Sequence, residues 1–185
     1  QEYMKETVGS QDQIASSVGG FNKIEFNKNG RFKINKIKKK NLKLLNNNLL
    51  LLYSGIQRNA HNIASNYINK LNYTYEKNIF RLMQYVDIGE ELIKKDQFND
   101  FGKLLHQAWQ EKKCLGPKIT NTKIDDLYNF TLDNGAIGGK LLGAGGGGFL
   151  LIYIPKSKQK GLISKLKNII NIPFNFSNEG SQVIF

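Results

Sequence analysis

The sequence predicts an α+β fold, in which a small antiparallel sheet carries helices on one face. Two short apolar runs, residues 49–53 and 149–154, are typical of buried strands. Between them, apolar residues recur at the three- and four-residue spacing of helices. One more helical pattern and an apolar tail follow the second run. The order strand, helices, strand, helix, hairpin favours this fold class.

Two hairpins are expected outside the apolar runs. Residues 24–26 and 32–34 alternate apolar and polar side chains, and Lys28-Asn29-Gly30 between them suits a tight turn. The tail, residues 174–185, alternates in the same way around a turn at Asn178-Glu179-Gly180. We therefore predict one hairpin near each end of the chain.

The middle of the chain contains four apolar stripes at helical spacing, each expected to face a core. A capping-box pattern, Thr122-x-x-Asp125, predicts the start of the last of these helices, and Asn134-Gly135 predicts its end. After Pro155, Ser157 suits the N-cap of another helix that extends to Ile170. The four stripes are Ile63, Tyr67, Ile68 and Leu71; Ile79, Leu82, Met83 and Val86; Phe101, Leu104, Leu105, Ala108 and Trp109; and Ile124, Leu127, Tyr128 and Leu132.

The composition is that of an ordinary globular protein, with 40% hydrophobic and 23% charged residues in a chain of 185. No run of about 18 apolar residues occurs, so no membrane partner is expected. The single cysteine, Cys114, cannot form an internal disulfide, which suits the cytoplasm. His61 and His106 are far apart and lack Cys or acidic neighbours at ligand spacing, so no metal site is expected on this chain.

A net charge of +12 is compatible with a nucleic-acid-binding module. The densest basic stretch is residues 36–40, but Lys, Asn and Ile are abundant throughout the chain. The charge therefore indicates a general compositional bias and a solvated loop at residues 36–40, and no nucleic acid partner is expected. An anionic small-molecule substrate is equally compatible with this charge.

The most informative segment is a glycine-rich loop at residues 135–149. The letters Gly143-x-Gly145-x-x-Gly148 match the dinucleotide fingerprint, but that motif opens a helix, whereas this loop leads into a strand. Gly138-Gly139-Lys140-Leu141 lacks the Ser or Thr that follows the lysine of a Walker loop. Successive backbone N–H groups in such a loop can form an anion site, so phosphate is the expected ligand.

Several motifs carry a resemblance to one superfamily. Residues 135–149 resemble the third signature motif of the GHMP kinases, which include galactokinase, homoserine kinase and mevalonate kinase. Residues 9–13, Gly-Ser-Gln-Asp-Gln, are similar to the segment with the catalytic aspartate in the sugar-kinase branch. In order along the chain, the motifs most resemble the D-glycero-D-manno-heptose 7-phosphate kinases. The further matching motifs are Gly19-Gly20-Phe21-Asn22, Tyr53-Ser54-Gly55-Ile56-Gln57-Arg58, Trp109-x-x-Lys112-Lys113 and Ile124-Asp125.

The resemblance implies a fold and a domain division. Residues 46–185 would form the ferredoxin-like C-terminal domain of a GHMP kinase, and residues 1–45 would be the remnant of the N-terminal, S5-like, ATP-binding domain. The Pro-x-x-x-Gly-Leu-Gly-Ser-Ser-type ATP loop of the family is absent from this sequence. The expectation is a carboxy-terminal part of a longer kinase, unable to phosphorylate a sugar alone, with its Mg²⁺ ligands on the missing part.

The resemblance also implies a reaction, the transfer of the γ-phosphate of ATP to the anomeric hydroxyl of the heptose 7-phosphate, on the way to nucleotide-activated heptose for surface polysaccharide. Asp12 would take or orient the hydroxyl proton, although an aspartate here is also suited to cap a helix starting near Gln13. Galactose or fucose as the sugar, and a noncatalytic binding role, stay open. The other expected site residues are Gly143, Ala144, Gly145, Gly146 and Gly147 beside the phosphates, and Arg58, Lys140 and Gly20 for substrate binding.

Overall fold

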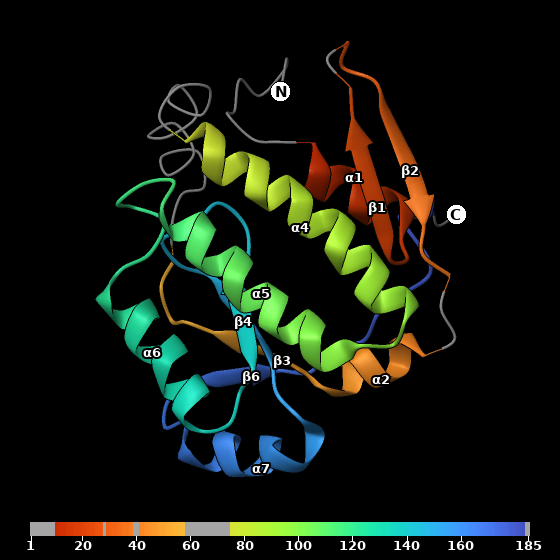
Figure 1. Cartoon of the computed structure of the whole chain (residues 1–185). Coiled ribbons are helices and arrows are strands. Elements are labelled where there is room, and N and C mark those ends of the chain that lie inside the picture. The colour runs from red at the N-terminus through yellow and green to blue at the C-terminus, as the bar shows by residue number, and fades with distance from the viewer. Residues whose placement is uncertain (1–9, 28, 39–40, 58–74, 184–185) are drawn as a thin grey trace.

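The computed structural model describes residues 10–27, 29–38, 41–57 and 75–183 (Figure 1). The centre of the fold is a four-stranded antiparallel sheet with the strand order β4-β5-β3-β6. Its strands are β3 (Leu49–Tyr53), β4 (Gly138–Leu141), β5 (Phe149–Tyr153) and β6 (Ile170–Ile172). The two apolar runs thus form the central pair of strands, β3 and β5, as predicted, and the α+β class is confirmed.

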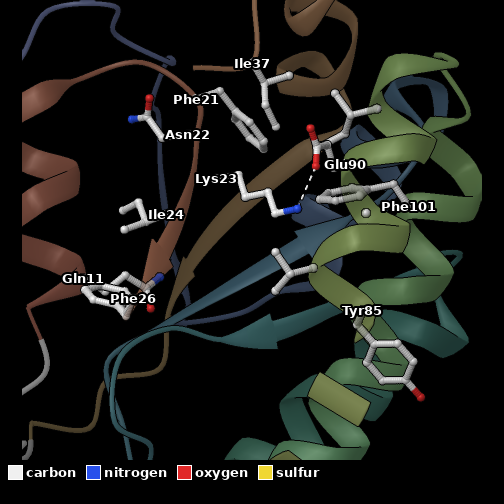
Figure 2. A pocket seen from close by; sticks show the side chains of 13 residues that line it. Gln11, Phe21, Asn22, Lys23, Ile24, Phe26, Ile37, Tyr85, Glu90 and Phe101 are labelled. Atoms are coloured by element: carbon white, nitrogen blue, oxygen red, sulfur yellow. Dashed lines mark hydrogen bonds and ion pairs between the residues drawn. The ribbon is translucent and has the colours of Figure 1, made fainter. Parts of the chain in front are cut away.

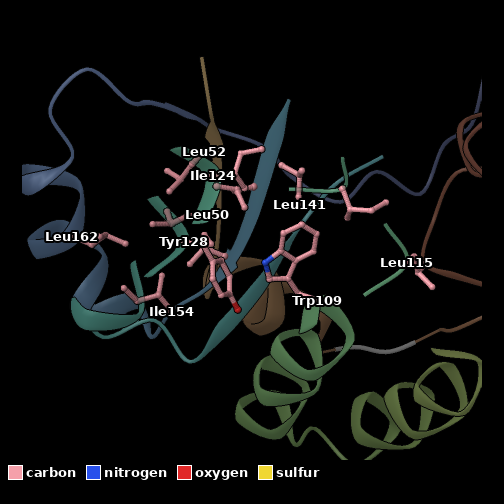
Figure 3. Packing of buried hydrophobic residues seen from close by; sticks show 12 residues of the cluster. Leu50, Leu52, Trp109, Leu115, Ile124, Tyr128, Leu141, Ile154 and Leu162 are labelled. Carbon is pink, nitrogen blue, oxygen red and sulfur yellow. The ribbon is translucent and has the colours of Figure 1, made fainter. Parts of the chain in front are cut away.

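Both faces of the central strands are apolar, so helices cover both and not one face as expected. On one face, Leu52 and Leu150 belong to the cluster around Trp109 shown in Figure 3, which includes side chains of α5 (Phe98–Lys113), α6 (Thr122–Asp133) and α7 (Lys156–Lys165). On the other face, Leu49 and Tyr153 pack with α2 (Leu42–Asn47), α4 (Glu76–Lys94) and the start of α5. Alternate residues of a strand point to opposite faces, which separates the two clusters.

Two glycines let helix α5 pack directly on strand β4. A Cβ atom added at Gly138 would collide with the carbonyl oxygen of Gly102 on α5, and one added at Gly102 would lie 2.5 Å from the Tyr153 ring. Gly138 and Gly139 were expected in the loop, so strand β4 was not predicted. Glycine weakens an isolated strand, and here the pairing with β5 and the packing of α5 stabilise β4.

Helix ends differ from the sequence predictions at several points. The N-cap of α6 is Asn121, whose Oδ1 accepts a hydrogen bond from the Ile124 N–H at 3.2 Å, whereas the capping box had favoured Thr122. Helix α6 ends at Asp133 as predicted. Helix α7 begins after Pro155 without a side-chain cap, so the expected Ser157 cap is wrong. It ends at Lys165, and Ile170, expected to lie in the same helix, instead begins strand β6 and pairs with Tyr53 of β3.

The tail does not form the expected hairpin, because residues 174–183 contain no strand. Instead it lies against the N-terminal segment. The Ser181 N–H donates to Ser16 O at 3.1 Å, and the Gly20 N–H donates to Ser177 O at 2.8 Å. Phe176 packs edge-to-face on Phe21 with ring centroids 5.6 Å apart. These contacts satisfy the tail's backbone groups without a partner strand.

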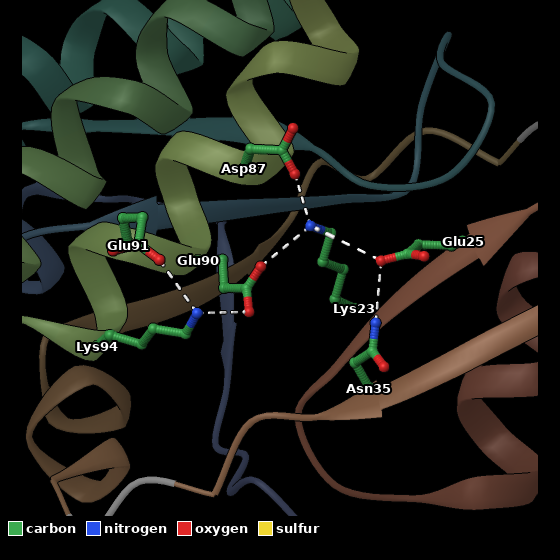
Figure 4. Close-up of polar contacts among 7 residues, drawn as sticks. All are labelled: Lys23, Glu25, Asn35, Asp87, Glu90, Glu91 and Lys94. Carbon is green, nitrogen blue, oxygen red and sulfur yellow. Dashed lines mark hydrogen bonds and ion pairs between the residues drawn. The ribbon is translucent and has the colours of Figure 1, made fainter.

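The N-terminal segment consists of helix α1 (Gln11–Val18) and the predicted hairpin, β1 (Asn22–Phe26) and β2 (Phe32–Lys36). Lys23 of β1 connects the hairpin to helix α4, since its Nζ lies 2.5 Å from Asp87 Oδ1 and 3.0 Å from Glu90 Oε2 (Figure 4). The hydrogen bond with Asp87 is the largest of the effects that raise the Lys23 pKa. Lys23 is therefore already neutralised and is not a free phosphate-binding cation.

Candidate functional site

Asp12 lies in the first turn of helix α1, where its side chain is exposed. The helix begins at Gln11 and its N-cap position is Ser10, so the alternative expectation, an Asp12 cap, is not met. A carboxylate in the first turn is still favoured by the helix dipole. Its exposure leaves both oxygens available to accept a proton or a hydrogen bond.

Lys140, on strand β4, is the cation that lies near Asp12. Burial lowers the pKa of Lys140 from its ordinary value, and the Asp12 carboxylate opposes this effect by raising it. The two side chains are therefore within electrostatic reach of each other, although they come from distant parts of the sequence. Lys140 is the second-last residue of β4, close to the point where this strand leads into the glycine loop.

The loop between β4 and β5 needs glycine for its backbone conformation. Gly143, Gly145, Gly146 and Gly148 have φ angles of 70°, 115°, 75° and 96°. At Gly145 there is also a steric reason for glycine, because a Cβ atom would lie 2.8 Å from the carbonyl oxygen of Ile119. A left-handed backbone and a close approach thus explain the glycine at this position.

Two neighbouring segments hold the second half of the loop. The Gly146 N–H donates to Ile119 O at 2.8 Å, and the Asn121 side-chain amide donates to Gly146 O at 3.1 Å. The Gly148 N–H donates to Ile56 O at 3.0 Å. By contrast, the N–H groups of Ala144 and Gly145 have no acceptor within the described ranges. These two groups are free to bind an anion.

Lys112 is part of the motif Trp109-x-x-Lys112-Lys113, but no role was predicted for it. In the structure its Nζ donates to the carbonyl oxygens of Leu141, at 3.4 Å, and of Gly143. It therefore holds the first half of the glycine loop from the last turn of helix α5. The sequence shows only that Lys112 lies near the end of a helix. That position does not predict a contact with a distant loop.

The glycine loop also borders a cavity of about 450 Å³. Its aromatic wall is the pair Tyr53 and Phe149, with ring centroids 5.3 Å apart. A second cavity, about 360 Å³, lies between helix α1, the hairpin and helix α4, where Lys23 points toward Glu90 (Figure 2). From the glycine loop, Leu142, Gly143 and Gly148 line the first cavity, whereas Lys23 and Glu90 in the second cavity neutralise each other.

The remaining expected site residues lie elsewhere. Gly20 follows helix α1, has a φ of 82° and lines a cavity of about 510 Å³ together with Lys36 and Lys38. Arg58 and His61 lie outside the described residues. Within the described residues, no group of three or more His, Cys, Asp or Glu side chains is placed to hold a metal ion. None of the helices in this described part is long and apolar enough to span a membrane.

Strands β4 and β5 of the antiparallel sheet, with the glycine loop between them, lie within a segment that matches a known family. Residues 90–171 match the family described as GHMP kinases C terminal. Over these residues the chain therefore carries the C-terminal domain of a GHMP kinase.

Within this class, one curated relative matches almost all of the chain. The D-glycero-alpha-D-manno-heptose 7-phosphate kinase of Campylobacter jejuni is 31% identical over 180 residues, which are 93% of this chain and 52% of the relative. The L-fucokinase/L-fucose-1-P guanylyltransferase of Bacteroides fragilis is 33% identical over 148 residues, 72% of this chain and 15% of the relative. The chain thus spans about half the length of the heptose kinase and less of the fucokinase.

A solved structure agrees with this relationship. The crystal structure of a sugar kinase from Campylobacter jejuni superimposes with a TM-score of 0.67 at 27% identity. The superposition covers 97% of this chain and 52% of that structure. The described fold therefore corresponds to about half of that structure.

Proposed function

We propose that this chain is the carboxy-terminal part of an ATP-dependent sugar kinase that phosphorylates the anomeric hydroxyl of D-glycero-D-manno-heptose 7-phosphate. The observation that carries this proposal is the glycine loop after β4, in which the Ala144 and Gly145 N–H groups have no acceptor within the described residues. The Asp12 carboxylate also raises the pKa of Lys140 on that strand, which supports a common site for a proton acceptor, a cation and this loop. Phosphoryl transfer depends mainly on such positioning and charge neutralisation.

Asp12 is proposed as the catalytic residue. Its carboxylate accepts the proton of the anomeric hydroxyl as that oxygen bonds to the γ-phosphorus of ATP and the bond to the ADP oxygen breaks. A carboxylate in this role must be within hydrogen-bond reach of the hydroxyl. The exposure of Asp12 on the first turn of α1 leaves room for a sugar at this position.

The glycine loop is proposed to bind the phosphates of ATP. The free N–H groups of Ala144 and Gly145 suit phosphate oxygens, and Gly143, Gly146 and Gly147 shape the backbone around them. Bound Mg²⁺ supplies charge neutralisation of the phosphates. We propose that its ligands lie outside this chain, because magnesium is held by oxygen ligands and the described residues offer no cluster of them.

The substrate-binding residues are proposed to be Lys140, Arg58 and Gly20. Lys140 provides a cation for a phosphate oxygen, and Arg58 suits the 7-phosphate because a guanidinium can bind two phosphate oxygens at once. We also propose a division of the chain into an N-terminal remnant, residues 1–45, and a C-terminal domain, residues 46–185. In this arrangement Asp12 and Gly20 come from one domain, and Lys140 from the other.

The heptose is favoured over fucose by the extent of the similarity. The heptose kinase matches 93% of the chain, against 72% for the fucokinase. The product would be a sugar 1-phosphate, the chemical form that a nucleotidyltransferase activates for polysaccharide synthesis. We propose that this reaction takes place in the cytoplasm, where ATP is available.

A transfer assay tests this function in the protein from the complete reading frame that encodes these residues. The enzyme is supplied with γ-labelled ATP and the heptose 7-phosphate, galactose or fucose. We expect kcat/KM to be higher for the heptose by about a hundredfold or more, because buried polar groups reject a mismatched sugar. The new phosphate should be released by mild acid, as anomeric phosphates are.

Two results would contradict the proposal. Preferred transfer to fucose or galactose would reassign the sugar, and the absence of transfer to all three would reject the kinase function. The 185-residue chain assayed alone is expected to show no turnover, so sugar-dependent ATP consumption by it would contradict the proposal that ATP binding needs further residues.

A further inference from the structure

Lys112 connects helix α5 to the glycine loop. It is half-buried in the last turn of the helix, and its ammonium group donates to Leu141 O and Gly143 O, on either side of the point where β4 becomes the loop. An ammonium group has three donors, so it can bind two carbonyl oxygens at once. Lys112 thereby fixes the direction of two peptide groups at the entrance of the loop.

Peptide planarity transmits this constraint to the anion-binding face. In a trans peptide the C=O of one residue and the N–H of the next point in opposite directions. With the Gly143 carbonyl turned toward Lys112, the Ala144 N–H points away from Lys112. Ala144 N–H is one of the two loop donors that have no acceptor in the described part of the chain. The orientation of this donor therefore depends on a contact made on the opposite side of the loop.

The rest of the loop is fixed by different groups. Ile119, Asn121 and Ile56 bind Gly146 and Gly148, so the second half does not depend on Lys112. The first half contains Gly143, whose backbone is in the left-handed region and is free to take other conformations when its carbonyl is released. Loss of Lys112 should therefore disturb the Ala144 donor and leave Gly148 in place.

We propose that Lys112 is a positioning residue. By donating a hydrogen bond to the Gly143 carbonyl oxygen, it orients the Ala144 N–H toward a bound phosphate chain. The inference rests on the proposed role of the loop in binding the phosphates of ATP. It assigns to Lys112 no contact with ATP or with the sugar.

The test uses the ¹⁵N-labelled 185-residue chain and inorganic tripolyphosphate as the probe, with the loop amides followed by NMR. Lys112→Met should weaken tripolyphosphate binding about tenfold, the usual effect of losing one charge-assisted hydrogen bond. Lys112→Arg, which keeps the donors, should restore most of the affinity. The matched control is Lys113→Met, since Lys113 is the next residue and pairs with Asp125 at 3.4 Å.

A second readout separates positioning from a purely structural role. In the protein from the complete reading frame, Lys112→Met should raise KM for ATP and lower kcat, while KM for the sugar phosphate stays unchanged. The amide signals of Leu150 and Gly148 should keep their positions, since β5 and the end of the loop are held by other groups. If Lys112→Met does not fold, Lys112→Gln, which is polar but shorter, provides the same comparison.

The outcomes distinguish this inference from the proposed function. Equal tripolyphosphate affinity of wild type and Lys112→Met would overturn the role of Lys112. No shift of the Ala144 or Gly145 amide in the wild-type chain would overturn the anion site as well. Failure of the kinase assay with intact tripolyphosphate binding would reject the kinase reaction and leave the role of Lys112 in anion binding standing.

Discussion

The Asp12 carboxylate on helix α1 and the Lys140 ammonium on strand β4 interact electrostatically, although they lie 128 positions apart in the sequence. Lys140 is half-buried, and within the described part of the chain no carboxylate lies within 4 Å of its ammonium group. Burial therefore lowers its pKa, and Asp12 only partly compensates. A phosphate group would neutralise this cation better than a distant carboxylate does.

Asp12→Asn should lower kcat by on the order of a hundredfold or more in the protein from the complete reading frame, because the amide cannot accept the hydroxyl proton. The fold should persist, since the side chain is exposed. Phosphoryl transfer and circular dichroism are measured together. Asp100→Asn, which removes an exposed acid paired with Lys103, is the control and should retain full activity. Near-normal turnover of Asp12→Asn would remove Asp12 from the mechanism.

The KM for the sugar phosphate should depend on the charge of Lys140. Because burial lowers the pKa of Lys140, the ammonium is lost at a lower pH than in an ordinary lysine, and KM should rise as pH increases toward 10.5. Lys140→Arg stays charged in this range and should show a flatter profile. KM measured between about pH 7 and pH 10 provides the test. Identical profiles of wild type and Lys140→Arg would exclude Lys140 from phosphate binding.

Gly138→Ala should lower the free energy of unfolding by about 1–3 kcal/mol, because its Cβ atom collides with the backbone of Gly102 and forces α5 away from β4. Gly161→Ala is the matched control. Gly161 lies within helix α7, and a Cβ atom there meets no other atom within 4 Å, so this variant should be stabilised by about 0.5–1 kcal/mol. Urea unfolding measures both. A stable Gly138→Ala chain would contradict the close contact of α5 and β4.

His106 should make the free energy of unfolding decrease when the pH falls below 6.5, the ordinary pKa of histidine. Burial, and to a smaller extent Lys113, lower the His106 pKa below 6.5. Between the two pKa values the unfolded chain binds more protons than the folded one, so the free energy of unfolding decreases as pH falls through this window. His106 Nδ1 lies 2.8 Å from the Tyr128 hydroxyl, which donates to Gly139 O at 3.3 Å.

His106→Gln measures this contribution, because glutamine does not titrate. The loss of stability between about pH 7.5 and pH 5.5, followed by urea unfolding, should be smaller in the variant than in the wild type. Other groups titrate equally in both chains and cancel in the comparison. An equal loss in the two chains would show that His106 is not the group responsible.

The sequence predicted those helices and strands whose own residues show an apolar run, a helical spacing or a turn motif. The apolar runs gave β3 and β5, helical spacing gave α5 and α6, and the Lys-Asn-Gly turn gave the first hairpin. Strand β4 was missed because its glycines indicate a loop, whereas the pairing with β5 and the contact with α5 stabilise it as a strand. The tail was misjudged because Phe174 and Phe176 alternate as in a strand, yet they pack on each other and on Phe21.

Some residues of the candidate site were also predicted from the sequence, whereas others were found only in the structure. Asp12 and the glycine loop were selected from their motifs, and the left-handed φ angles of the loop agree with the glycines found there. The contacts of Lys112 with the loop were not visible, because a lysine at the end of a helix is usually solvated.

By itself, the sequence determined which segments are apolar, where glycine frees the backbone, and which family the ordered motifs resemble. Only the tertiary structure decided that Asp12 acts on Lys140, that Lys112 holds Gly143, and that both faces of the sheet are covered. The physical reason is that local conformation depends on neighbouring residues, whereas charges, carbonyl groups and apolar surfaces interact through space once packing has brought distant segments together.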